Sequence, residues 1–139
     1  MPAFSRIASS LALAGLLAAC AASGPTRPAA WLAPETLVQP SSFSGVHGLA
    51  VDKQGRLLAG TVAGSQMWEV NRHTGEARVF IPAPEGQSDD IAIGPKGEMA
   101  WTSFNQGVLR YRENDNAPMR VLAKGLPGIN SVDFDKKTG

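Results

Sequence analysis

The chain has 139 residues, of which 43% are hydrophobic and 18% charged, so its composition is that of one ordinary globular domain and not of a disordered chain. Its formal net charge is +1, and the 13 basic residues are scattered among 12 acidic ones, which excludes the concentrated basic patch that nucleic-acid binding requires. Fifteen glycines and ten prolines indicate many turns between short strands, and the single cysteine excludes an internal disulfide.

Residues 1–19 have the layout of an export signal. A short start that carries Arg6 is followed by an apolar stretch from Ile7 to Ala19, which is too short to span a bilayer. The stretch ends in Leu17-Ala-Ala-Cys20, which resembles the lipobox of bacterial lipoproteins, in which the cysteine becomes lipid-modified and begins the mature protein. The alternative is a plain secretory signal that happens to precede a cysteine, and both interpretations predict export.

The lipobox resemblance implies that acyl chains on Cys20 hold the protein at a membrane of the cell envelope, facing the periplasm or the outside. Each buried methylene contributes about 0.8 kcal/mol to such anchoring. Residues 20–33 include Gly24, Pro25 and Pro28 and are predicted to form a flexible tether. The folded domain is then expected to cover residues 34–139.

An internal repeat of about 42 residues organises the rest of the chain. The segment His47–Gly55 matches Asp89–Gly97 at its apolar positions and in its final glycine, and a third copy begins at Asn130. The spacings are 42 residues (47 to 89) and 41 residues (89 to 130), which is the length of one four-stranded propeller blade.

Each repeat unit is predicted to contain four short strands joined by tight hairpins. In the first unit the four runs are 48–51, 57–61, 67–71 and 77–81, and a segment at Thr36–Val38 matches the last of them. Glycine lies where hairpin turns often need positive φ, at Gly55, Gly75 and Gly97. A single meander cannot bury its own apolar residues, so blades pack face to face in a ring. The sequence therefore predicts an all-β fold, a β-propeller of antiparallel four-stranded meanders.

The length of the chain sets how much of the ring is expected. Six blades of this size need about 250 residues, whereas only about 120 follow residue 19. We therefore expect about two and a half blades of a six-bladed propeller, and we expect the sequence to be a fragment of a longer protein.

Three polar residues, His47, Asp89 and Asn130, occupy the same repeat position at the start of a blade. The first strand of each propeller blade runs along the central channel, so these side chains are expected to converge on one site that holds a small-molecule ligand or a metal ion. The alternative is that they cap backbone groups before a strand, a role that suits Asp and Asn.

The blade starts resemble those of the gluconolactonase and regucalcin (senescence marker protein) family. The resemblance rests on Asp89-Asp90, on Pro95-Lys-Gly97 and on Pro127-Gly-Ile-Asn-Ser131. It implies a six-bladed propeller with one divalent cation, usually calcium, in the channel, and in many members hydrolysis of sugar lactones. The expected function is therefore metal-dependent hydrolysis of a sugar lactone or a related ester.

The same resemblance suggests roles for the three channel residues. Asn130 matches a metal ligand of the family, Asp89 matches a position that contacts substrate or metal-bound water, and His47 stands where the family has a Glu ligand. An imidazole in place of a carboxylate removes one charge and one hard oxygen, which weakens a calcium site and favours a softer metal or none. The family's Asp ligand would lie beyond Gly139. A non-catalytic propeller that binds a ligand or a protein is the alternative.

A second resemblance leaves a third function open. Gly45-Val-His-Gly-Leu49 and Trp101-Thr-Ser103 also look like repeats of virginiamycin B lyase-like propellers and of proteins with the NHL repeat. In the lyase family a His near the axis takes part in opening a lactone ring by elimination, with magnesium, which would make His47 catalytic. If His47 is structural instead, its imidazole is expected to bond a carbonyl of a neighbouring blade.

The remaining motifs have simpler interpretations. Trp68 and Trp101 are expected to pack between blades, and Trp31 to cover an edge near the tether. No glycine-rich phosphate loop is present, so the sequence predicts no nucleotide cofactor.

Overall fold

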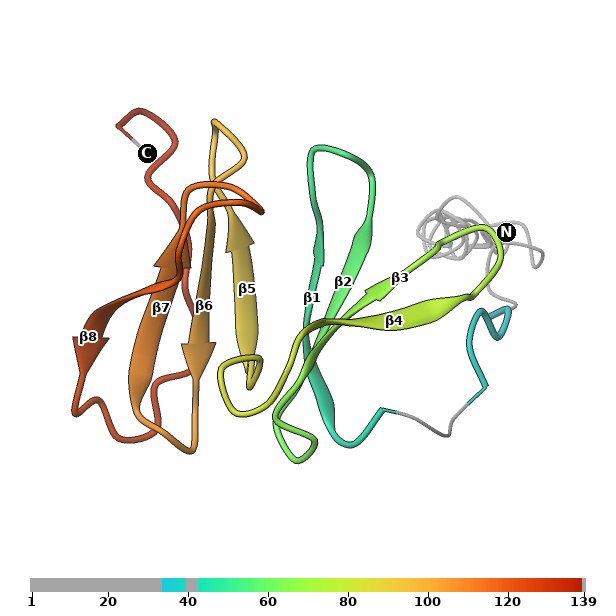
Figure 1. Ribbon diagram of the computed structural model, residues 1–139, viewed down its shortest axis with the longest axis horizontal. Helices are drawn as coiled ribbons and strands as arrows, with labels where there is room; N and C mark the ends of the chain where they lie inside the picture. The colour runs from blue at the N-terminus through green and yellow to red at the C-terminus, as the bar shows by residue number, and fades with distance from the viewer. Residues whose placement is uncertain (1–33, 40–42, 139) are drawn as a thin grey trace, which may run out of the picture. The chain divides into compact units, whose positions relative to one another are not determined.

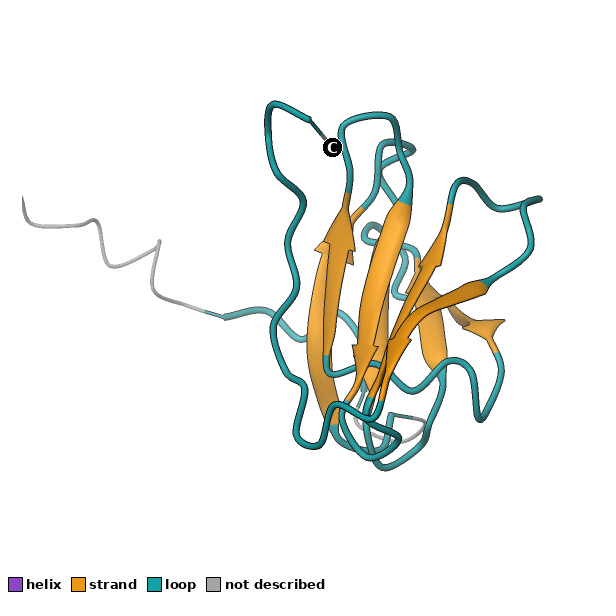
Figure 2. Ribbon diagram, turned by 90° about the vertical axis from the view of Figure 1, so that its left-hand side faces the viewer, coloured by secondary structure: helices purple, strands orange, loops and turns teal. Residues whose placement is uncertain are grey.

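The computed structural model describes residues 34–39 and 43–138, and in these residues the regular elements are β-strands (Figures 1 and 2). The predicted export signal, Cys20, Trp31 and the tether all lie in residues 1–33, outside the described residues. Within the described residues no helix is long and apolar enough to cross a membrane.

The strands form two four-stranded antiparallel sheets, each with its strands in sequence order (Figure 1). We call the first sheet blade 1; its strands are β1 (Val46–Val51), β2 (Leu57–Thr61), β3 (Met67–Val70) and β4 (Ala77–Ile81). We call the second sheet blade 2; its strands are β5 (Asp90–Ile93), β6 (Met99–Ser103), β7 (Val108–Arg112) and β8 (Arg120–Lys124). The predicted all-β architecture of successive meanders is confirmed.

The turns follow the chemistry expected from the sequence. Gly55 and Gly97, which close the hairpins after β1 and β5, have φ angles of 78° and 96° and so occupy the left-handed region that favours glycine. The Asp52 carboxylate also accepts hydrogen bonds from the backbone N–H groups of Gln54 and Arg56, each 2.9 Å long, which shapes the first of these turns.

The match of Thr36–Val38 to the fourth strand of a blade is wrong at the level of structure. Residues 37 and 38 form a bend, and the Leu37 carbonyl lies against Gly75 in the turn between β3 and β4. A strand needs a hydrogen-bonded neighbour, and this segment contacts a turn instead of a strand edge.

One apolar core joins the two blades. It consists of residues that are at most 6% exposed, three from each blade: Leu58, Met67, Ile81, Ile91, Met99 and Trp101. Strands β1 and β5, the first of each blade, lie next to each other across this core (Figure 1). The packing of one sheet face on another is what the repeat predicts, because neither meander can bury its apolar face alone.

The two strand tryptophans have different environments. Trp101 is fully buried between the blades, as predicted, and its indole N–H donates a 2.9 Å hydrogen bond to the Glu85 carbonyl in the connection between β4 and β5. Trp68 follows Met67, a core residue, along β3 and therefore points to the opposite face of blade 1. It meets Phe43 there in an edge-to-face contact with ring centroids 5.2 Å apart.

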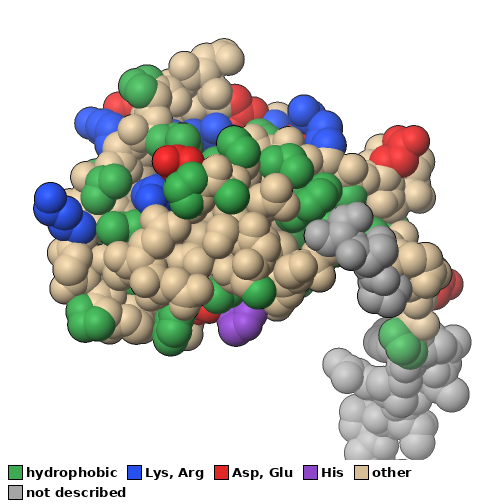
Figure 3. Space-filling view, turned by 60° about the horizontal axis from the view of Figure 1, so that its bottom comes forward, with side chains coloured by type: hydrophobic (Ala, Val, Ile, Leu, Met, Phe, Trp, Pro, Cys, Tyr) green, Lys and Arg blue, Asp and Glu red, His purple; other side chains and the backbone are tan. Residues whose placement is uncertain are grey.

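On the face drawn in Figure 3, the Lys and Arg side chains lie in several separate places, and a His side chain lies beside an Asp or Glu side chain at the lower edge.

Candidate functional site

Two of the three predicted channel residues form a pair. His47 Nδ1 lies 2.9 Å from Asp89 Oδ1, so the start of blade 1 contacts the start of blade 2. The Asp89 side chain is 4% exposed, whereas that of His47 is 56% exposed. The pair therefore consists of a buried carboxylate and an imidazole whose far side is open to solvent.

The backbone around His47 explains why its side chain reaches the next blade. The ladder between β1 and β2 is regular from Leu49 onward and is interrupted between Val46 and Leu49. Such an irregularity re-aims the side chains that it contains. At the same point Gly48 lets the two backbones approach, because a Cβ there would lie 3.2 Å from the Asp89 carbonyl oxygen and from the Asp90 Cα.

A layer of buried polar groups fixes the connection that carries Asp89. The Asp89 N–H donates to the Thr102 carbonyl over 2.9 Å, and Ser103 Oγ donates to the Gln87 carbonyl over 2.8 Å. Gln87 Nε2 in turn donates to the Val62 carbonyl of blade 1 over 3.1 Å. Because these groups are buried and paired, both blades hold the backbone of the connection that carries Asp89.

The geometry of the pair gives the imidazole a defined chemical role. A carboxylate at Nδ1 keeps the proton of the neutral ring on that nitrogen, which leaves the Nε2 lone pair free on the exposed side. An Nε2 oriented in this way can accept a proton or bind a metal ion. If His47 were structural, the sequence predicted that its imidazole would bond a backbone carbonyl of the neighbouring blade. Its partner in the structure is instead the side-chain carboxylate of Asp89.

Asn130 occupies a different setting. Its carbonyl accepts a hydrogen bond from Thr102 Oγ1, and Ser131 Oγ donates to its side-chain oxygen over 3.5 Å. Among the described residues, no hydrogen bond joins the Asn130 side chain to His47 or Asp89. The third repeat is attached to blade 2 through Asp90, whose Oδ2 accepts from the Val132 N–H over 2.9 Å.

The described residues do not by themselves make a calcium site. Within them no group of three or more His, Cys, Asp and Glu side chains is placed to hold a metal ion. Calcium takes six to eight oxygen ligands, and one oxygen of Asp89 is already bonded to His47.

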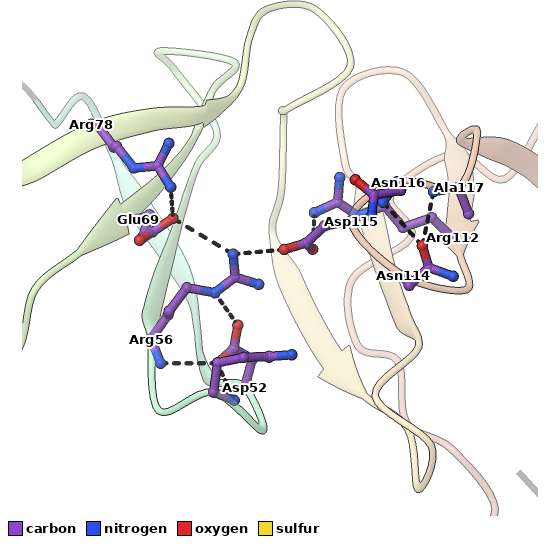
Figure 4. Close-up of polar contacts among 10 residues, drawn as sticks. Asp52, Arg56, Glu69, Arg78, Arg112, Asn114, Asp115, Asn116 and Ala117 are labelled. Atoms are coloured by element: carbon purple, nitrogen blue, oxygen red, sulfur yellow. Dashed lines mark hydrogen bonds and ion pairs between the residues drawn. The ribbon is translucent and has the colours of Figure 1, made fainter.

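Sequence reasoning missed a group of charged side chains at the opposite end of the strands (Figure 4). Arg56, after the turn between β1 and β2, contacts Asp115, in the turn between β7 and β8, over 2.7 Å. Asp115 also contacts Arg112 over 3.0 Å, and both guanidinium groups lie over the Phe80 ring. A hydrogen bond from Arg56 lowers the pKa of Asp115 below its ordinary value. Arg56 and Asp115 lie in different hairpins of their blades, so the repeat pattern gave no signal that they would meet.

A groove of about 320 Å³ lies at this end, between the blades, with an apolar floor that includes Leu58, Phe80 and Met99. Its rim carries Arg56 and Asp115, which are already paired with each other. We therefore place the candidate site at His47 and Asp89, where the exposed nitrogen faces outward, and regard the groove as part of the joint between the blades.

No protein-family model and no curated protein matches the chain. Several solved structures do. A chain of a nidogen–laminin complex has a TM-score of 0.56 at 21% identity, over 66% of this chain and 36% of that chain. Virginiamycin B lyase from Staphylococcus aureus has a TM-score of 0.50 at 14% identity, over 66% and 30%. Aldose sugar dehydrogenase from Streptomyces coelicolor, in its PQQ-bound form, has a TM-score of 0.52 at 18% identity, over 67% and 33%.

The chain thus spans about a third of the length of the solved structures that it resembles. At these levels of identity the likeness shows the fold alone. The similar structures are propeller proteins, and the two four-stranded sheets in this chain match their architecture. The described residues therefore form part of a β-propeller, with two blades and the start of a third.

Proposed function

We propose that this propeller binds a small cyclic ester, a lactone, at the channel end of its blades and opens the ring, with His47 as the acid–base group. The observation that carries the proposal is the pair of a half-exposed imidazole and a buried carboxylate from the next blade, 2.9 Å apart. In many enzymes a histidine acts as general base while a carboxylate binds one of its ring nitrogens and leaves the other free to take the proton.

Ring opening is the chemistry that both sequence resemblances share. In hydrolysis, Nε2 of His47 takes a proton from a water molecule, the water oxygen adds to the ester carbonyl, and the C–O bond of the ring breaks as the leaving oxygen is protonated. In elimination, Nε2 takes a proton from the carbon next to the alkyl carbon that bears the ester oxygen, a C=C bond forms, and the bond between that alkyl carbon and the ester oxygen breaks to leave a carboxylate. Both routes need one base with a free nitrogen, which His47 supplies.

Asp89 acts in this proposal as the residue that orients the base. Its burial and its backbone hydrogen bond to Thr102 keep the carboxylate in one position. The negative charge also stabilises the imidazolium that forms when Nε2 takes a proton.

The proposal also includes a divalent cation that would polarise the ester carbonyl. Asn130 would offer its side-chain oxygen to the cation, with further ligands from outside the described residues. A magnesium or calcium requirement is expected for the full-length protein, and activity that is unaffected by a chelator would remove this part of the proposal.

Anchoring through Cys20 places the reaction at the cell envelope. The proposal rests on the lipobox resemblance at Leu17–Cys20. Cys20→Ser is expected to release the protein from the membrane fraction, and continued retention in that fraction would contradict lipidation.

The test of His47 uses the full-length protein and a panel of sugar lactones and cyclic depsipeptides. His47→Gln is expected to lower kcat about 10²- to 10⁴-fold, the range that a general base supplies. His73→Gln is the matched control, because His73 is the other histidine and lies in an exposed hairpin turn. Mass spectrometry of the product separates hydrolysis, which adds one water, from elimination, which adds nothing.

A non-catalytic ligand-binding propeller is the second candidate, and the imidazole at a position where the gluconolactonase family has a carboxylate ligand favours it. It predicts that a lactone binds without turnover, with or without added cations. Equal kcat values for the His47 variant and the wild type would also overturn the proposed role of His47.

A further inference from the structure

We infer that Asp90 is a positioning residue that sets the direction of the Asn130 side chain relative to His47 and Asp89. The inference rests on the proposed function, because it concerns the same channel site. It starts from the contrast between two neighbouring carboxylates: Asp89 bonds to blade 1 and Asp90 bonds to the third repeat.

The Asp90 carboxylate holds two backbone groups at once. Its Oδ1 accepts from the Ile91 N–H over 3.0 Å, and its Oδ2 accepts from the Val132 N–H over 2.9 Å. The first bond fixes the rotamer of the carboxylate on β5. The second bond joins that strand to a residue 42 positions later in the chain, and hydrogen bonds to an ionised acceptor are among the stronger ones in proteins.

Thr102 completes the attachment from the next strand. It is fully buried and lies opposite Asp90 in the ladder between β5 and β6. Its hydroxyl accepts from the Asp90 N–H over 3.1 Å and donates to the Asn130 carbonyl. The carbonyl of Asn130 and the N–H of Val132 are therefore held by two adjacent residues of blade 2.

We call Asp90 and Thr102 the clamp. It binds the two peptide groups on either side of Ser131. The direction of a side chain depends on the conformation of its own backbone. The clamp therefore determines the direction in which the Asn130 side chain points. Asn130 and Ser131 are themselves exposed. The described contacts that hold their peptide groups are those of the clamp.

Blade 1 shows that the clamp is not a general requirement of packing one blade start on the next. The residue equivalent to Asp90 in blade 1 is Gly48, which has no side chain and packs its backbone directly against Asp89 and Asp90. A carboxylate at this repeat position is therefore a feature of blade 2 alone among the two described blades. Because successive residues of a strand point to opposite faces, Asp89 and Asp90 together link three blade starts.

The clamp predicts a specific pattern of activity. Asp90→Asn keeps the size of the side chain but has one acceptor oxygen instead of two and no charge, so it cannot accept from both the Ile91 N–H and the Val132 N–H. We expect kcat/KM of the full-length protein to fall about 10- to 100-fold, the usual cost of losing a group that orients a ligand residue. Thr102→Val should act in the same direction, and Thr102→Ser, which keeps the hydroxyl, is the matched control.

A double-mutant cycle separates positioning from general destabilisation. If Asp90 acts through Asn130, Asp90→Asn should change kcat/KM less than about twofold when Asn130 is already Ala. An equal loss in both backgrounds would mean that Asp90 only stabilises the fold, and it would overturn the inference.

Hydrogen exchange tests the clamp without any activity. The Val132 amide should exchange about tenfold faster in Asp90→Ala, which has no side-chain acceptor, whereas the Asp89 amide, which donates to the Thr102 carbonyl, should keep its protection as an internal reference. Unchanged exchange at Val132 would overturn the inference. A wild-type protein that exchanges as expected but opens no lactone would overturn the proposed function and leave the clamp supported.

Discussion

The two junctions between repeats are built from different interactions although the repeats share one sequence pattern. Between blades 1 and 2 the joint is a core of six residues, each at most 6% exposed, with glycines that bring the backbones together. Of the third repeat only residues 130–138 are described, and these contact blade 2 through the Asp90–Thr102 clamp and through an aromatic contact, Tyr111 with Phe134, at a centroid distance of 6.5 Å. At the equivalent positions Gly48 and Asp90, the same repeat pattern therefore joins successive blade starts in two ways, by backbone packing and by a carboxylate.

The largest expected effect tests the apolar character of the first junction. Trp101→Ala should lower the free energy of unfolding by about 3–5 kcal/mol, because the side chain is fully buried between the blades and bonds to Glu85. Chemical denaturation of the 139-residue chain, in which these exposures hold, measures the change. Trp68→Ala is the control and should cost clearly less, since Trp68 is only half-buried and lies on the other face of blade 1. Equal losses would contradict a core centred on the junction.

A close approach of backbones gives the next largest effect. A Cβ at Gly60 would lie 2.5 Å from Ser88 Cβ and 2.7 Å from the Ser88 carbonyl oxygen. Gly60→Ala is therefore expected to cost about 1–3 kcal/mol in the free energy of unfolding. Gly48→Ala, whose Cβ would have 3.2 Å contacts, should cost less. A larger loss of stability for Gly48→Ala than for Gly60→Ala would contradict the order that these distances predict.

The described part of the second junction should contribute less to the stability of the 139-residue chain. Phe134→Ala is expected to cost about 1 kcal/mol, because the ring is only half-buried and its described aromatic contact is with Tyr111. Leu58→Ala in the first junction provides the comparison and should cost about 2–5 kcal/mol. Similar values for the two variants would erase the difference between the junctions.

The smallest effect concerns pH and the charged end of the first junction. The hydrogen bond from Arg56 lowers the pKa of Asp115 below its ordinary value of 3.8. The carboxylate therefore contributes stability fully above that value, and the contribution is lost as the pH falls through the lowered pKa. Asp115→Asn should flatten the acid side of the stability profile by less than about 1 kcal/mol, because the pair is half-exposed and screened by solvent. An unchanged acid profile would show that Asp115 adds no stability.

Much of the candidate site was predictable, but the partners within it were not. The repeat placed His47 and Asp89 at equivalent blade starts, and the structure brings them within 2.9 Å. The repeat also placed Asn130 at the same position, yet the described contacts tie its backbone to Thr102 and not its side chain to the other two. Asp90 and Thr102 entered only through the family resemblances, and nothing in the sequence indicated their contacts with the third repeat, because a carboxylate and a hydroxyl in strands have many surface roles.

The sequence by itself determined the strands and their turns, because alternation of apolar residues and glycine at tight corners are local properties that repeat every 42 residues or so. It also determined that the meanders must pack on one another. Only the tertiary structure decided that His47 binds a carboxylate, that the Gly48 backbone packs against Asp89 and Asp90, and that the Asp90 carboxylate binds the Val132 N–H. These contacts join residues about 42 positions apart across the two junctions, so they depend on how far each blade turns against the next, which no local pattern encodes.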